Sequence, residues 1–215
     1  MPRKLTRAFV AAAVAACAAA GTVVVAQPSA AGTVVVAQPS AAGNQLRQQS
    51  GAHAWPWKLV DTSPDLVRPK ALTVDRSIGD RGAALEVRLA QQLYTFWNTG
   101  EKKYLDLAVS PDFRDNTLPP GRPQGPAGPV FASEHFRAAV PDLTCELSDL
   151  LITGDKITAR LVFRGHFTGS YNGVPGKGQT VDFNAIDIQH VGARQIVEDW
   201  HIEDNQTLLS QLGVA

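Results

Sequence analysis

Residues 195–213, QIVEDWHIEDNQTLLSQLG, carry the side chains best suited to chemistry. Read as a strand, this segment alternates its side chains between two faces. One face holds Ile196, Glu198, Trp200, Ile202 and Asp204, and the other holds Val197, Asp199, His201 and Glu203. The first face is mainly apolar, which predicts that it packs on the core. A buried carboxylate costs several kcal/mol unless it is paired or protonated. The carboxylates on this face are therefore either structural ion-pair members or titratable groups in a pocket.

Asp204 has two interpretations of equal weight. It follows the predicted strand and precedes the helical pattern NQTLLSQLG, which is the position of a helix N-cap. Alternatively, it is the acid/base group of an apolar pocket. Glu198 is interpreted as the partner of an arginine inside the fold, and His201 as facing solvent or a subunit interface. The five histidines show no metal-ligand spacing, so no metal site is expected.

The elements that position these residues form two groups along the chain. Apolar residues at helical spacing predict a helix over 81–98, and a shorter helix follows over 101–109. Ser133 is a candidate cap of a third helix that ends before Pro141. The period then changes to two, and four strands are predicted: TCELSDLLIT, KITARLVFRGHFTG, QTVDFNAIDIQHV and RQIVEDWHI. Helices followed by an antiparallel meander indicate an α+β fold.

The first 43 residues have the pattern of an export signal rather than of a fold. A basic start precedes the apolar run AFVAAAVAACAAA, and GTVVVAQPSAA then occurs twice, at 21–31 and 32–42. The run contains a lipobox-like sequence at 14–17, so Cys17 is a candidate lipidation site; an ordinary cleaved signal is the alternative. Residues 44–79 are interpreted as a linker or extension, either a spacer or a cover for a pocket. The folded domain is expected over 80–215.

Composition excludes some classes of function. Loss of Arg3, Lys4 and Arg7 with the signal leaves 17 of the 20 basic residues against 20 acidic ones, a net charge of −3. Nucleic-acid binding needs a basic face, so no nucleic-acid partner is expected. Apart from Cys17 the chain has one cysteine, Cys145, which alternates with apolar residues and is interpreted as a core residue.

The stretch from Val140 to Val181, followed by IVEDWHIEDNQTLLSQLG, resembles the SnoaL-like polyketide cyclase or ester cyclase family of the nuclear transport factor 2-like superfamily. The resemblance rests on PDL at 141–143, GDK at 154–156, the glycines of GHFTG and GVP at 173–175, and on Glu198, Trp200, Asp204 and the closing QLG. It covers about residues 82–215. It implies a cone-shaped, curved antiparallel sheet packed on the N-terminal helices, as in a cystatin-like α+β roll, with a ligand-binding pocket at the wide end.

The resemblance also implies a cofactor-independent acid/base enzyme that closes a ring by an intramolecular aldol reaction. In that family the aspartate four residues after the tryptophan serves as the acid/base, and here that residue is Asp204. Substrate-binding candidates are Asp115, Asn116, Phe163, Phe167, Trp200 and Glu198. Asn116 and Phe167 stand where the family often has histidine, so they depart from its pattern.

Two classes of function follow. The first is an exported cyclase-type enzyme acting on a hydrophobic carbonyl compound, in the periplasm, outside the cell or tethered as a lipoprotein. The second is a non-catalytic module that binds an apolar small molecule at the cell envelope. Another reaction on the same scaffold, such as epoxide hydrolysis or dehydration, is a weaker third. The resemblance further implies a homodimer through the outer face of the sheet, and membrane contact only through an N-terminal lipid anchor.

Overall fold

The computed structural model describes residues 55–214. The predicted export signal, Cys17 and the start of the predicted linker lie outside the described residues. Within them no helix combines the length and the apolar character needed to cross a membrane.

Four α-helices and two short 3₁₀ helices form in the described part of the chain. The α-helices are α2 (Gly79–Thr99), α3 (Lys102–Ala108), α4 (Ala127–Ala139) and α5 (Asn205–Leu212), and the 3₁₀ helices are η1 (Trp57–Leu59) and η2 (Arg76–Ile78). Helix α2 ends at Gly100, whose φ of 78° is in the left-handed region that favours glycine. The two predicted N-terminal helices are confirmed. The third begins six residues before Ser133, so that residue does not cap it.

The main sheet has six strands in the order β1-β3-β4-β7-β8-β2. Their bounds are β1 (Ala71–Val74), β2 (Val109–Asp115), β3 (Thr144–Thr153), β4 (Lys156–Phe167), β7 (Gln179–Val191) and β8 (Ile196–Glu203). The four predicted strands form the expected antiparallel meander. The edge strands β1 and β2, which pair in parallel with β3 and β8, were not predicted. A small hairpin of β5 (Ser170–Tyr171) and β6 (Val174–Pro175) adds a second sheet.

Part of the predicted linker belongs to the fold. Strand β1 extends the sheet, and the backbone N–H of Val67 donates a hydrogen bond to Thr95 Oγ1 of α2 at 3.0 Å. Gln91, also on α2, donates to the backbone oxygens of Asp61 and Val67 at 2.9 Å each. The domain therefore begins before Asp80, since helix α2 alone cannot satisfy these buried polar groups.

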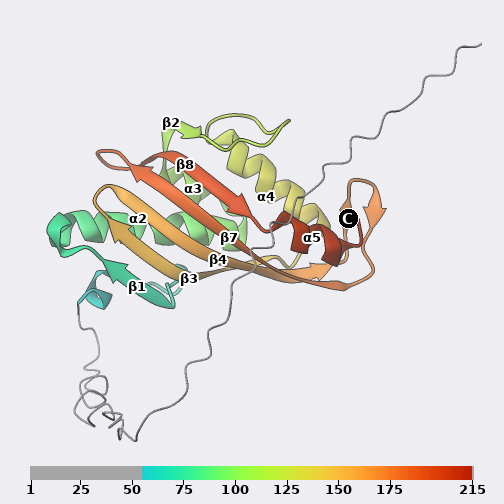
Figure 1. Ribbon diagram of the computed structural model, residues 1–215, viewed down its shortest axis with the longest axis horizontal. Helices are drawn as coiled ribbons and strands as arrows, with labels where there is room; N and C mark the ends of the chain where they lie inside the picture. Colours follow the sequence, from blue (N-terminus) through green and yellow to red (C-terminus); the bar gives the residue numbers. More distant parts are fainter. Residues whose placement is uncertain (1–54, 215) are drawn as a thin grey trace, which may run out of the picture. The chain divides into compact units, whose positions relative to one another are not determined.

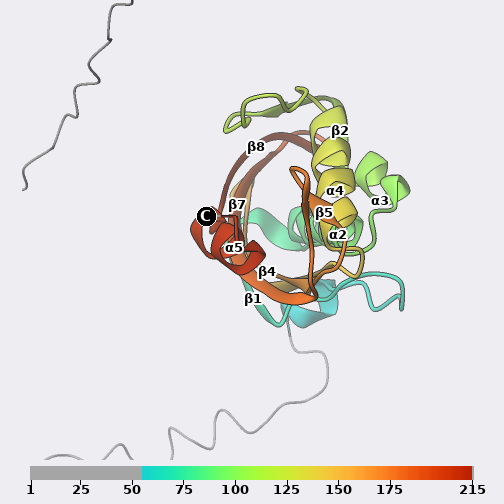
Figure 2. The ribbon, with the colours of Figure 1, turned by 90° about the vertical axis from the view of Figure 1, so that its right-hand side faces the viewer.

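The core lies between the concave face of the sheet and the helices. Figure 2 shows the sheet curving from β1 to β8, with α2 and α4 on its concave side, and Figure 1 shows α5 lying along β7. Alternate residues of β4 point inward, so Ile157, Ala159 and Leu161 are buried whereas Arg160 and Arg164 are exposed. The predicted α+β fold with a curved, mainly antiparallel sheet packed on helices is confirmed.

A β-bulge in β8 decides which of its side chains face inward. The register runs from Val191 opposite Ile196 to His190 opposite Glu198, so Val197 is an extra residue. After the bulge, His201 is buried, whereas Ile202 is 75% exposed. The prediction for the faces of this strand is therefore wrong from Glu198 onward, because one extra residue reverses the alternation.

Candidate active site

A cavity lies between the concave face of the sheet and helices α2 and α4. Its cavity volume is about 40 Å³, within about 680 Å³ of space that includes the open mouth. Its apolar walls are formed by Leu93, Trp97, Phe113, Pro129, Phe136, Leu143, Leu161, Phe163, Phe183 and Ala185. Its polar residues are Asp115, Arg122, Asp187, Asp199, His201 and Glu203. An apolar cavity with a few converging titratable groups is the usual form of a small-molecule site.

Three neighbouring strands bring the polar residues together. Asp187 of β7 lies opposite His201 of β8, and Asp199 of β8 lies opposite Asp115 of β2. All four point to the concave side. The parallel pairing of β2 with β8 is what carries Asp115 to this cluster, although it precedes Asp199 by 84 positions in the chain.

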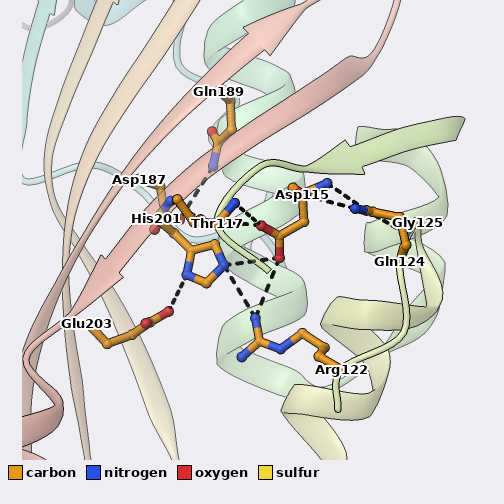
Figure 3. A network of polar contacts seen from close by, with 9 residues as sticks. All are labelled: Asp115, Thr117, Arg122, Gln124, Gly125, Asp187, Gln189, His201 and Glu203. Carbon is orange, nitrogen blue, oxygen red and sulfur yellow. Dashed lines mark hydrogen bonds and ion pairs between the residues drawn. The ribbon is translucent and has the colours of Figure 1, made fainter. Parts of the chain in front are cut away.

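His201 lies at the centre of the polar cluster (Figure 3). Its Nδ1 is 2.6 Å from Glu203 Oε1, and its Nε2 is 3.1 Å from Asp115 Oδ2. Burial lowers the pKa of His201, but the hydrogen bond and charge of Glu203, with those of the other carboxylates, raise it to about 9. The ring is therefore an imidazolium at neutral pH and donates from both nitrogens. Burial also raises the pKa of Glu203, yet the contact with His201 outweighs this effect and lowers it below its ordinary value.

Two further carboxyl groups in the cavity have pKa values raised above the ordinary value of an aspartate. Burial raises the pKa of Asp187 to about 7, although the charge of His201 opposes the shift. Burial and the nearby charge of Asp187 raise the pKa of Asp199 well above its ordinary value. The two groups therefore titrate as an interacting pair, in which the charge of each favours the protonated form of the other. Carboxyl groups with such pKa values are typical of general acids and bases.

A buried hydrogen-bond network supports Asp187. Tyr94 on α2 donates its hydroxyl proton to Asp187 Oδ2 at 3.2 Å, and Gln189 Nε2 donates to the Tyr94 oxygen at 2.9 Å. Asp199 has no such support, since its Oδ1 is buried without a hydrogen-bond partner among the described residues. Asp187 is thus fixed in position, whereas Oδ1 of Asp199 can still form a hydrogen bond with a ligand.

The loop between β2 and α4 is attached to the same cluster. Gln124 bonds to both backbone groups of Asp115: its Oε1 accepts from the N–H at 2.8 Å and its Nε2 donates to the carbonyl at 2.9 Å. Thr117 donates its N–H to Asp115 Oδ1 at 2.8 Å and accepts from the N–H of His201 at 2.9 Å. These bonds hold Arg122 of the loop at the cavity (Figure 3). Across residues 55–214 no three His, Cys, Asp or Glu side chains are arranged to hold a metal ion.

Comparison with known proteins assigns the chain to a family. The model of the family described as SnoaL-like polyketide cyclase matches residues 87–212, more than half of the chain. The chain belongs to the SnoaL-like polyketide cyclase family. Its fold is accordingly that of the nuclear transport factor 2-like superfamily, as the resemblance predicted. None of the curated proteins is significantly similar to the chain.

Several solved structures are similar over nearly their whole length. A protein from Bacillus cereus, provisionally named a polyketide cyclase, is 44% identical with a TM-score of 0.66, over 72% of this chain and 98% of its own. IdmH from Streptomyces antibioticus, also provisionally named a polyketide cyclase, is 31% identical with a TM-score of 0.54, over 60% and 99%. TsrD from Streptomyces laurentii is 29% identical with a TM-score of 0.56, over 61% and 97%.

The structure of this SnoaL-like chain places Asp204 at the N-cap of α5, one of the two positions that the sequence left open. Its side chain is exposed and accepts hydrogen bonds from the Thr207 N–H at 3.0 Å and the Thr207 hydroxyl at 2.7 Å, as the N-cap of α5. These hydrogen bonds lower its pKa. Because it neither lines the cavity nor has a raised pKa, its position fits the capping alternative and not that of a pocket acid/base.

Glu198 and Trp200 lie on the outer face of the sheet, not inside the cone. Glu198 bonds to His190 Nδ1 at 2.9 Å rather than to an arginine. Trp200 is 37% exposed and pairs across the strands with Ile188. The bulge in β8 explains both corrections. The outer face is thus apolar where the homodimer was expected, and the homodimer remains a prediction.

The other predicted residues divide between the cavity and the core. Asp115 and Phe163 line the cavity. Phe167 is fully buried in the core and does not line it. Asn116 is half-buried beside the cluster, where its backbone N–H donates to the Asp199 carbonyl at 2.8 Å, and it does not line the cavity either.

Sequence reasoning missed Asp187, Asp199 and Arg122 as site residues, and it predicted that His201 faces solvent or a subunit interface. One signal was available in β7: Asp187 and Gln189 lie on the same face as Val181, Phe183, Ala185 and Val191, so two polar residues interrupt an apolar face. Polar side chains on an otherwise apolar strand face indicate a pocket or a buried network.

Proposed function

We propose that this protein is a cofactor-independent acid/base enzyme of the cyclase type, acting on a hydrophobic carbonyl compound through Asp187 and Asp199. One observation carries the proposal: two carboxyl groups with raised pKa values line an apolar cavity beside a buried imidazolium. Their environments differ, which suits one to act as base and the other as acid.

Asp187 is the base in this proposal. With a pKa of about 7 it is partly ionised at neutral pH. Its carboxylate takes a proton from the carbon next to a carbonyl group; the C–H electron pair becomes a carbon–carbon double bond, and the carbonyl π pair moves onto the oxygen to give an enolate. The imidazolium of His201, which lies opposite Asp187 in the sheet, favours the ionised form before the transfer.

Asp199 is the acid. Burial and the charge of Asp187 favour its protonated form, and its position at the cavity allows it to donate a hydrogen bond there. The enolate carbon attacks a second carbonyl of the same molecule to form the ring bond, and the new alkoxide takes a proton from Asp199. Asp187 returns its proton to Asp199 directly or through water, so protons balance over the cycle.

The cavity walls indicate a flat, apolar substrate. Phe163 and Phe183 stack with their ring centroids 5.2 Å apart and their planes at 15°, and Trp97 meets Phe163 edge-on at 6.1 Å. Such surfaces fold an unsaturated chain so that its reacting carbons approach one another. Export stays part of the proposal because residues 1–43 have the pattern of an export signal. The mass of the mature protein, measured after fractionation of the cells, tests whether this signal is removed.

The proposal is tested by the exchange of α-protons of acetophenone with D₂O, followed by NMR. We expect catalysed exchange by the wild type and a loss of at least about 100-fold in Asp187→Asn. Asp182→Asn is the matched control, because Asp182 is on the outer face of the same strand and pairs with Arg164. Wild-type protein that binds acetophenone without exchange above the background rate contradicts the proposal and favours the non-catalytic binding module.

A further inference from the structure

The guanidinium group of Arg122 has no hydrogen-bond acceptor among the described residues. Its side chain is 15% exposed, and its nearest carboxylate oxygen, Asp115 Oδ2, is 3.8 Å away, beyond hydrogen-bond distance. Its one polar contact within 3.5 Å among the described residues is His201 Nε2, at 3.4 Å. That nitrogen already donates to Asp115, so it offers Arg122 no lone pair.

Arg137 shows how a structural arginine of this fold is paired. It is also half-buried, yet its two terminal nitrogens donate to the backbone oxygens of Trp97 at 2.7 Å and Leu143 at 3.0 Å. Arg122 makes no comparable bond. Taking a charged group out of water is costly when its donors are unpaired, so the arrangement favours a ligand that supplies an acceptor.

The chain around Arg122 holds this side chain at the cavity. Arg122 is the only charged residue of the loop NTLPPGRPQGP at 116–126, and Pro123 follows it directly. The aliphatic part of Arg122 passes over Gly128: a Cβ there would lie 3.6 Å from Cδ and 3.7 Å from Cγ, and 2.6 Å from the Pro123 oxygen. A glycine at 128 therefore lets the loop and the arginine pack closely on α4.

Charge balance indicates the kind of group that Arg122 binds. Two cations, Arg122 and the His201 imidazolium, lie beside three acidic side chains, Asp115, Glu203 and Asp187. An anionic substrate adds to this negative charge. A neutral carbonyl compound does not, because the proton transfer only moves the charge from Asp187 to the substrate oxygen.

We propose that Arg122 is a catalytic residue that donates hydrogen bonds to the carbonyl oxygen on which negative charge develops. This inference rests on the proposed function and adds the group that stabilises the enolate. Donors fixed in advance toward such an oxygen are among the strongest contributions to catalysis. Asp115 acts on Arg122 as a positioning residue, since it holds the loop through Thr117 and carries the nearest negative charge.

The experiment uses 4-nitrophenol, whose phenolate resembles an enolate and is detected by its visible absorbance. We expect the wild type to bind this probe with the phenol pKa lowered. Arg122→Gln should bind the phenolate at least about tenfold more weakly, and Arg122→Lys should recover part of the effect. Arg114→Gln is the matched control, because Arg114 is an exposed arginine of β2 next to Asp115.

The outcomes separate this inference from the proposed function. Equal phenolate binding by wild type and Arg122→Gln overturns the inference, and so does a failure of the wild type to bind the phenolate at millimolar concentration. Phenolate binding that depends on Arg122, without acetophenone exchange, supports the anion site and contradicts the proposed reaction. Exchange that depends on Asp187 but is unchanged in Arg122→Gln supports the reaction and contradicts the role of Arg122.

Discussion

Replacing Glu203 by glutamine tests the central electrostatic claim, that His201 is an imidazolium. The pKa of His201 is raised from 6.5 to about 9. At about 1.4 kcal/mol per pKa unit, this difference corresponds to about 3–4 kcal/mol in favour of the charged ring. The Glu203 contact at 2.6 Å is the largest of the interactions that raise it. We therefore expect Glu203→Gln to lower the pKa of His201 by at least about one unit.

NMR titration of the histidine ring protons measures this change directly, with the His201 signal assigned from a His201→Asn variant. Glu198→Gln is the matched control, because Glu198 is on the outer face of the same strand and bonds to His190. A wild-type His201 that titrates near 6.5, or one whose pKa is the same in Glu203→Gln, would refute the reasoning.

The same change affects the pH dependence of stability. A histidine with a raised folded-state pKa stabilises the protein fully below the unfolded value of 6.5, and this stabilisation is lost as the pH rises through about 9. The free energy of unfolding of the wild type should therefore exceed that of Glu203→Gln by more at pH 6 than at pH 10. A difference that is constant over this range in urea titrations contradicts the assignment.

Two further predictions concern Glu86 and Asp204. Glu86 is 6% exposed, one of its carboxyl oxygens has no hydrogen-bond partner among the described residues, and burial raises its pKa from 4.5 to about 7. A carboxyl group with a raised folded-state pKa lowers the free energy of unfolding as the pH rises from 4.5 through 7. Glu86→Gln should therefore stabilise the protein by up to about 3 kcal/mol at pH 8 but have little effect at pH 4. Equal effects at both pH values in urea unfolding would count against this. Asp204→Ala should cost about 1 kcal/mol, whereas Asp204→Asn should be nearly neutral in stability and in acetophenone exchange, since asparagine caps a helix as well as aspartate. A loss of exchange in Asp204→Asn with unchanged stability would restore Asp204 as a catalytic candidate.

The predictable part of the fold depends on local periodicity. The strands β3, β4 and β7 have long period-two patterns with turn residues between them, and helix α2 has apolar residues at helical spacing. The edge strands β1 and β2 have no such signal. They are short and pair in parallel with strands that are distant in sequence, so their strand conformation depends on partners that the local pattern does not contain.

The capping role of Asp204 was visible in the sequence because an N-cap is a local feature. It needs only the aspartate, the Thr207 N–H three residues later and the helix that follows. By contrast, a raised pKa depends on burial by residues from distant parts of the chain. Asp187 and Asp199 have this property only because helices α2 and α4 cover the concave face of the sheet on which they lie.

The sequence by itself determined that a curved α+β domain would end in a strand rich in carboxylates, followed by a capped helix. Only the tertiary structure decided which of those carboxylates face the cavity. The bulge at Val197 adds one residue to β8, and Gly192 leaves room for it: a Cβ on this glycine would lie 2.8 Å from Val197 Cγ1. Because strand faces alternate at every residue, this single insertion turns Asp199 and His201 inward and Trp200 outward.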